Sequence, residues 1–289
     1  MTSTLSGNNT TPAWFQQAVE TTPESLYLER DNARIHYLAW NDAEHDKPAL
    51  VFCHGYRGHA RWWSFIAPFF TTKFRVYAPD WAGMGDSDPR EEYIDATYDN
   101  DIAAFIHTIS DKPVTAVGHS FGGGRLMQFG AEQQDLLSHL IVVDAHADME
   151  KAEDYPPIAG GDRRTYPDLN TAMDSFRLSP PQQGIQPWAF DWIGRHSLRP
   201  WEGGWTWKFD PRINLLNTRR ALAPEHLPRL SCRLDQIYGR NSAIVSDARA
   251  AAIMQFAKNP GKLVGIPGGD HHLMISHPEA LIASLMALL

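Results

Sequence analysis

Continuous apolar runs alternate along the chain with segments whose apolar residues recur at helical spacing. Parallel strands buried on both faces give unbroken apolar runs, whereas amphipathic helices place apolar residues three and four positions apart. The runs predict strands at 49–53, 74–79, 113–117, 140–143, 231–239 and 262–266. Helices are predicted at 14–19, 62–70, 99–109, 124–131, 247–257 and 278–289. This order predicts right-handed crossovers and therefore an α/β fold with a mostly parallel, doubly wound sheet.

Two stretches depart from this alternation. Near the N-terminus, alternating residues at 25–30 and 33–40 flank Asp31-Asn32, which predicts an antiparallel hairpin at an edge of the sheet. From about 147 to 223 the pattern breaks down: Pro and Gly are frequent, aromatic residues gather, and no strand is predicted. We therefore divide the chain into a core, 1–146 and 224–289, and an insertion, 147–223.

Composition narrows the class of protein. A chain of 289 residues that is 43% hydrophobic can bury one large core plus an inserted subdomain. Its formal charge of −8 argues against nucleic-acid and anionic-membrane partners. The N-terminus lacks a basic-then-apolar secretory signal and no apolar run could span a bilayer, so a cytoplasmic location is expected. Cys53 and Cys232 are expected to be buried thiols, and no metal-ligand spacing is evident.

A short turn, Val-Gly-His-Ser-Phe-Gly-Gly-Gly at 117–124, joins a predicted strand to a predicted helix. Such a turn lifts the Ser120 hydroxyl above the sheet, and Gly118 and Gly122 leave room where a side chain would collide. The helix start directs free N–H groups toward whatever the serine attacks. With these flanks the chain resembles the α/β-hydrolase family.

The resemblance implies the α/β-hydrolase fold with a helical cap, formed here by 147–223, over the site. It implies that Ser120 is the nucleophile. His54-Gly55 follows the predicted strand at 49–53, and in the family a His-Gly-x pair at this place supplies half of the oxyanion hole. The backbone N–H groups of Tyr56 and Phe121 are therefore the implied oxyanion donors. His54 itself is interpreted as a residue that shapes the loop.

The resemblance also places a catalytic histidine after the last strand. In family members it typically lies seven residues before a proline that opens the final helix. His271 has this spacing to Pro278, whereas the adjacent His272 is one residue short. We therefore prefer His271 as the base that takes the serine proton.

The acid departs from the usual family pattern. Family members usually carry it three residues after the glycine that ends the strand at 231–239, and Ser242 occupies that position. A subset places the acid at the end of the preceding strand, where this chain has Asp144. We assign Asp144 to orient His271, with Asp247 and Asp235 as alternatives.

A second family signature lies in the loop 80–88, whose Gly-Met-Gly-Asp-Ser-Asp segment resembles haloalkane dehalogenases. The likeness is restricted to the scaffold, because those enzymes need an aspartate nucleophile where this chain has Ser120. Asp80, Asp86 and Asp88 are interpreted as turn-forming carboxylates that bond their own backbone.

The resemblance implies a serine hydrolase that cleaves carboxylic esters through an acyl-serine intermediate, without a cofactor or metal. The aromatic insertion favours a hydrophobic or aromatic substrate moiety, with Trp81, Trp188 and Trp192 as candidate substrate-binding residues. The expected partner is a small-molecule ester, with no nucleic acid or membrane, and a homodimer is left open. Two alternatives remain: a carbon–carbon bond hydrolase whose cap anchors a carboxylate through Arg195 or Arg199, and a weakly catalytic ligand receptor on this fold.

Overall fold

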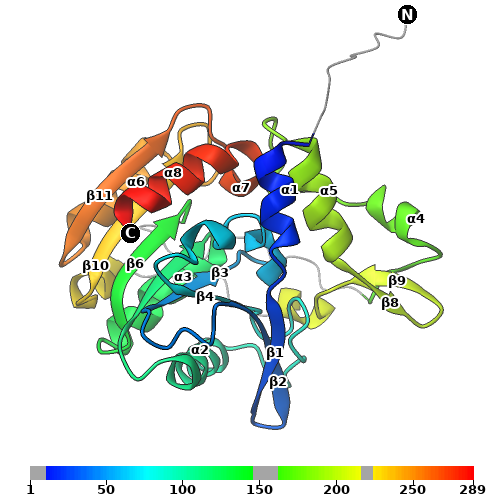
Figure 1. Ribbon diagram of the computed structural model, residues 1–289, viewed down its shortest axis with the longest axis horizontal. Helices are drawn as coiled ribbons and strands as arrows, with labels where there is room; N and C mark the ends of the chain where they lie inside the picture. The colour runs from blue at the N-terminus through cyan, green and yellow to red at the C-terminus, as the bar shows by residue number, and fades with distance from the viewer. Residues whose placement is uncertain (1–10, 146–161, 216–223) are drawn as a thin grey trace, which may run out of the picture.

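An eight-stranded sheet runs through the centre of the molecule (Figure 1), in the order β1-β2-β4-β3-β5-β6-β10-β11. The structure is a computed structural model that describes residues 11–145, 162–215 and 224–289. Its central strands are β1 (Glu24–Arg30), β2 (Ala33–Trp40), β3 (Ala49–Cys53), β4 (Arg75–Pro79), β5 (Val114–His119), β6 (Leu137–Val143), β10 (Arg233–Gly239) and β11 (Pro260–Ile266). Pairing is antiparallel between β1 and β2 and between β2 and β4, and parallel elsewhere. The predicted mostly parallel α/β sheet is confirmed.

The edge hairpin is also confirmed, and its turn explains the connection. Asp31 and Asn32 have φ values of 49° and 59°. Two consecutive positive φ angles define the two-residue turn whose twist matches that of paired strands, and Asn and Asp tolerate this conformation well.

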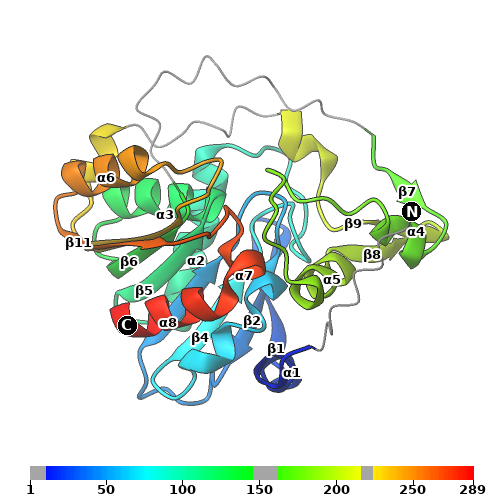
Figure 2. The same ribbon diagram turned by 90° about the horizontal axis from the view of Figure 1, so that it is seen from above.

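Helices cover both faces of the sheet, as Figure 2 shows from above. They are α1 (Ala13–Glu20), α2 (Asp95–Ile109), α3 (Phe121–Glu132), α4 (Leu169–Met173), α5 (Pro187–His196), α6 (Asp247–Phe256), α7 (Leu273–Ser276) and α8 (Pro278–Leu288). Short 3₁₀ helices are η1 (Ala60–Trp63), η2 (Ala67–Phe70), η4 (Pro211–Leu215) and η5 (Pro224–Arg229). None of the helices in the described ranges is both long and apolar enough to cross a membrane.

The strands serve two hydrophobic cores because successive side chains point to opposite faces. In β3, Val51 and Cys53 pack with α2, α3 and α6, whereas Leu50 and Phe52 pack with α1 and α8. All four side chains are fully buried. Burial on both faces accounts for the unbroken apolar runs, and the carboxyl ends of β5 and β6 lie side by side where the candidate site begins.

One predicted helix is wrong. The segment expected as a single helix at 62–70 forms η1 and η2, separated by a short turn. Pro68 lies in η2, lacks an N–H donor and disfavours helical geometry at Ala67 before it, so a continuous α-helix cannot run through this segment.

The insertion is not purely helical, which corrects the expectation that it lacks strands. Its described part, 162–215, contains α4 and α5 and an antiparallel sheet in the order β7-β9-β8. These strands are β7 (Thr165–Tyr166), β8 (Leu198–Trp201) and β9 (Gly204–Trp207). Glu202 and Gly203, with φ of 45° and 80°, form the hairpin turn between β8 and β9. The boundaries predicted at 147 and 223 lie outside the described residues.

Candidate active site

Ser120 lies on the turn between β5 and α3 in a strained backbone conformation, with φ 51° and ψ −119°. Its N–H donates to the carbonyl of Val143 at 3.0 Å. A Cβ on Gly118 would lie 2.7 Å from the Gly123 nitrogen, and one on Gly122 would lie 2.5 Å from the His54 carbonyl oxygen. The flanking glycines are therefore required by close backbone approach, as the sequence indicated.

The structure brings Ser120, His271 and Asp144 together at the carboxyl ends of the strands. His271 Nε2 lies 3.0 Å from Ser120 Oγ, and His271 Nδ1 lies 2.8 Å from Asp144 Oδ1. His271 is 3% exposed and Asp144 is fully buried. In the neutral imidazole, an Nδ1–H that donates to the Asp144 carboxylate leaves Nε2 to accept a hydrogen bond from the serine hydroxyl.

The carboxyl group of Asp144 is held from two further directions. Gly239 N–H donates to Oδ2 at 2.7 Å, and the Ser242 hydroxyl donates to Oδ1 at 2.6 Å. Ser242 occupies the position where family members usually carry the acid. In this chain it contacts Asp144, the carboxylate assigned that role at the end of the preceding strand. Sequence reasoning noted this serine but gave it no role, although its place in the pattern was a usable signal.

The alternative residues lie in other contacts. Asp235 pairs with His139 at 2.6 Å and with Arg233, and Asp247 accepts the Tyr238 hydroxyl proton at 2.8 Å. The His272 ring packs against Trp62 and His119, with ring centroids 5.4 and 5.5 Å apart. Of the three carboxylates considered, only Asp144 meets His271 within the described structure.

His119, which precedes Ser120, is a residue whose role the sequence did not reveal. Its Nε2 donates to the His271 carbonyl oxygen at 3.0 Å and so ties the end of β5 to the loop that carries His271. Burial, reinforced by the neighbouring His271 and His272, holds the pKa of His119 well below its ordinary value. The lowered pKa favours the neutral form of His119, which still donates this hydrogen bond through Nε2–H.

Of the two candidate oxyanion residues, Tyr56 lies in the loop after β3 and Phe121 lies at the start of α3. Phe121 is the first residue of α3, and its ring centroid lies 5.7 Å from that of Tyr56. His54 shapes the Tyr56 loop, because its Nδ1 donates to the Gly55 carbonyl at 2.8 Å and its Nε2 accepts the Trp81 N–H at 3.1 Å. Burial lowers the pKa of His54, which keeps this tautomer neutral.

The three candidate substrate-binding tryptophans do not converge. Trp81 is 4% exposed and packs edge-on against Phe121 at 5.9 Å, so it supports the Ser120 turn from behind. Trp188 packs against Phe15 of α1, and Trp192 packs against Phe15 and His196. Figure 1 shows α1 beside α5, which makes this aromatic contact the junction between the insertion and the core.

Two groups of side chains have a composition that could suit a metal. His119, His271 and His272 offer nitrogens within 4.8 Å of one another, and His36, Asp80 and Asp86 form a similar group. Zinc–nitrogen bonds of about 2.0–2.1 Å require closer ligands, and both His271 ring nitrogens already bond Asp144 and Ser120. The histidine group would therefore have to rearrange to hold an ion.

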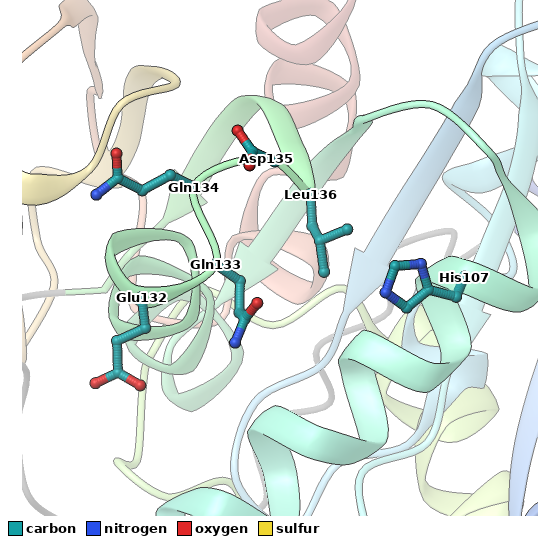
Figure 3. Close-up of a pocket in the computed structure, with 6 residues that line it drawn as sticks. All are labelled: His107, Glu132, Gln133, Gln134, Asp135 and Leu136. Atoms are coloured by element: carbon teal, nitrogen blue, oxygen red, sulfur yellow. The ribbon is translucent and has the colours of Figure 1, made fainter.

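A separate pocket lies near the carboxyl end of α3 (Figure 3). It is lined by His107, Glu132, Gln133, Gln134, Asp135 and Leu136. Ser120 precedes the opposite end of this helix, which at 1.5 Å per residue places it about 18 Å from Glu132. This pocket is not part of the serine site.

A serine on a strained strand-to-helix turn, with an imidazole and a carboxylate beside it on a doubly wound sheet, is typical of α/β-hydrolases. Residues 50–284 match the model of the Alpha/beta hydrolase family. The chain belongs to this family.

Individual relatives are distant or partial. An uncharacterized protein of Mycobacterium bovis is 37% identical over 99 residues, which cover 34% of this chain and 29% of that protein. The bifunctional esterase/perhydrolase DCH of Acinetobacter calcoaceticus is 23% identical, over 90% of this chain and 97% of that protein. Among solved structures, a thioesterase domain from the curacin biosynthetic pathway superposes with a TM-score of 0.76 and 21% identity, over 92% and 99% of the two chains.

Proposed function

We propose that this chain hydrolyses carboxylic esters through an acyl-serine intermediate formed on Ser120. The observation that carries the proposal is the contact of His271 Nε2 with Ser120 Oγ at 3.0 Å, with Nδ1 on Asp144 at 2.8 Å. A serine hydroxyl is a weak nucleophile at neutral pH, and a base at hydrogen-bonding distance is what it needs.

Each group has one role in this reaction. As Ser120 Oγ bonds to the ester carbon, its proton passes to His271 Nε2, and Asp144 stabilises the imidazolium. The N–H groups of Tyr56 and Phe121 bind the oxyanion, and His271 then protonates the departing alkoxide. Water repeats the sequence on the acyl-serine and releases the acid.

A hydrophobic acyl or alcohol group is the proposed substrate moiety. Tyr56 and Phe121 supply both proposed oxyanion donors and an aromatic pair beside the serine turn, and Trp81 packs behind Phe121. Apolar walls with few polar groups are typical of small-molecule sites. Direct substrate contacts by Trp188 and Trp192 remain a proposal, since their ring contacts among the described residues are with α1, Phe65 and His196.

The test is turnover of para-nitrophenyl butyrate by the wild-type chain and matched variants. Ser120→Ala and His271→Ala should each lower kcat/KM by about 10⁴-fold or more, because each removes a member of one proton-transfer unit. Ser246→Ala and His272→Ala are the controls, and each should retain most of the activity. Background rates in the wild type would instead favour the receptor alternative, and equal losses in His271→Ala and His272→Ala would contradict the assignment of the base.

A second candidate reaction is hydrolysis of a carbon–carbon bond in a vinylogous diketone that carries a carboxylate. Arg199 favours it, since its Nε is buried and has no hydrogen-bond partner among the described residues. Arg195, the other predicted anchor, instead bonds both carboxylate oxygens of Asp191. Turnover of such a diketone without ester hydrolysis, with KM raised by Arg199→Gln, would support this reaction over the first.

A further inference from the structure

A second serine–histidine–aspartate arrangement lies on the edge hairpin, away from the Ser120 turn. Ser25 of β1 has its Oγ 2.8 Å from His36 Nε2, and His36 Nδ1 lies 2.7 Å from Asp80 Oδ2. The corresponding distances at the Ser120 site are 3.0 and 2.8 Å. The two arrangements share no residue, and β1 is the outermost strand of the sheet (Figure 1).

The hairpin register explains why these side chains meet. Ser25 lies opposite Leu38 and Tyr27 opposite His36, so Ser25 and His36 are diagonal neighbours on one face of the β1–β2 ladder. His36 is 2% exposed, whereas Ser25 is exposed to solvent. A buried base therefore faces a hydroxyl that reagents can reach.

Asp80, the carboxylate of this second arrangement, is held in place by several hydrogen bonds. Its Oδ1 accepts the Ala60 N–H at 2.5 Å, and its Oδ2 accepts the Asp86 N–H at 2.8 Å as well as His36 Nδ1. Burial acts to raise the pKa of Asp80, but the hydrogen bond from His36, the nearby His36 and His54 rings and the Asp86 N–H lower it to about 2. The interpretation of Asp80 as a carboxylate that only bonds its own loop is thus incomplete, because it also contacts the edge hairpin.

The protonation pattern follows from this contact. An ionised carboxylate cannot donate, so His36 Nδ1–H donates to Asp80, and in the neutral imidazole Nε2 accepts the hydrogen bond of the Ser25 hydroxyl. This is the state in which an imidazole acts as a general base. What Ser25 lacks is the strained turn, since it lies within a regular strand and is absent from the positive-φ residues of the described chain.

We propose that Ser25 is a second activated hydroxyl, which accepts the acyl group of activated esters and retains it. Ser25 Oγ bonds to the acyl carbon as its proton passes to His36 Nε2, the carbon–oxygen bond to the aryl group breaks, and the aryloxide leaves with the electron pair. His36 then returns its proton to solvent. The product is a persistent acyl-Ser25, because no turn of the kind at Ser120 presents helix N–H groups for a second step.

The test uses the Ser120→Ala chain, so that turnover at the first site does not consume the reagent. With para-nitrophenyl acetate at neutral pH, intact-mass and peptide measurements should find one acetyl group on Ser25. Adding Ser25→Ala should remove it, whereas adding Ser246→Ala should not. Ser246 is the matched control, since it is exposed and its hydroxyl, among the described residues, accepts only the helix N–H of Arg249. Acetylation spread over lysines, or none at Ser25, would overturn the proposal.

A second measurement does not require a change to the buried His36. Ser25→Cys should react with iodoacetamide about 10-fold faster than Ser246→Cys at neutral pH, because an adjacent imidazole favours the thiolate. The natural thiols give little background, since burial raises the pKa of Cys53 and raises that of Cys232 to about 11. Equal alkylation rates at positions 25 and 246 would show that His36 does not activate this position.

Discussion

Both carboxylate oxygens of Asp144, the acid of the proposed triad, accept hydrogen bonds. Asp144 Oδ1 accepts hydrogen bonds from His271 Nδ1 and from the Ser242 hydroxyl, while Oδ2 accepts one from the Gly239 N–H. A carboxylate oxygen can accept two such bonds, so Ser242 fixes the carboxyl group without displacing the histidine. Ser242 is thus a positioning residue next to the place where a carboxylate could also reach His271.

Moving the carboxylate from position 144 to position 242 is therefore expected to preserve part of the ester turnover. Asp144→Ala should lower ester turnover by about 10⁴-fold, since His271 loses the group that fixes its tautomer. Adding Ser242→Asp should recover about 10-fold or more, because the new carboxyl group lies close to the vacated one. The measurement is kcat at constant pH.

The matched control for this exchange is Asp144→Ala with Ser246→Asp, which adds a carboxylate outside the site. Equal recovery from positions 242 and 246 would contradict the positioning role. Asp247→Asn should leave turnover nearly unchanged, because Asp247 contacts Tyr238 and Arg240 and not His271. A large loss from Asp247→Asn with near-normal turnover in Asp144→Asn would overturn the assignment of the acid.

At the scale of an element, the start of α3 holds one glycine that close packing requires, Gly122, and another that it does not, Gly124. A Cβ on Gly122 would lie 2.5 Å from the His54 carbonyl oxygen and 2.8 Å from that of Cys53. A Cβ on Gly124, one position beyond Gly123, would have no atom within 4 Å. Close packing of the helix start against the strand end explains the first glycine, while the second has no steric requirement.

Alanine at these two positions should therefore have opposite effects. Gly124→Ala should raise the free energy of unfolding by about 0.5–1 kcal/mol, because it removes backbone entropy from the unfolded chain. Gly122→Ala should lower it by about 1–3 kcal/mol and reduce ester turnover, because the backbone at His54 must move. Urea unfolding and para-nitrophenyl butyrate turnover measure both effects, and a stable, fully active Gly122→Ala chain would contradict the close approach.

At the scale of the whole molecule, buried imidazoles link parts that are far apart in sequence. His59 Nε2 donates to Ser197 Oγ at 2.8 Å, which joins the core to the carboxyl end of α5. His119 joins β5 to the loop before α7, and His272 lies in the same cluster. Burial holds the pKa of each of these three histidines well below its ordinary value, so the folded molecule keeps them neutral.

Stability should consequently fall as the pH drops below the ordinary histidine pKa of about 6.5. The unfolded chain takes up protons there and the folded chain does not, so protonation favours unfolding. Each such histidine contributes a slope of up to about 1.4 kcal/mol per pH unit. Urea unfolding measured between pH 7 and pH 5 gives the free energy of unfolding as a function of pH. This free energy should fall less steeply with pH for His59→Gln than for the wild type, and parallel curves would contradict the neutral, buried state of His59.

Strands were predicted better in the core than in the insertion. Apolar runs predicted β3, β4, β5, β6, β10 and β11, and the alternating pattern of the edge hairpin predicted β1 and β2. Each of these signals lies within the residues of one strand or one hairpin. In the insertion, β8 and β9 have four residues each and their alternation is too brief to stand out from the surrounding Pro and Gly. The turn residues Glu202 and Gly203 were the usable signal there.

The sequence by itself determined the succession of strands and helices along the chain, the serine turn and the histidine position, since each depends on residues near one another in the chain. Only the tertiary structure decided that Asp144 meets His271, that Ser242 and His119 hold them, and that Ser25 lies on His36. These contacts join positions 11 to 152 residues apart. They depend on sheet register and loop packing, which no local pattern specifies.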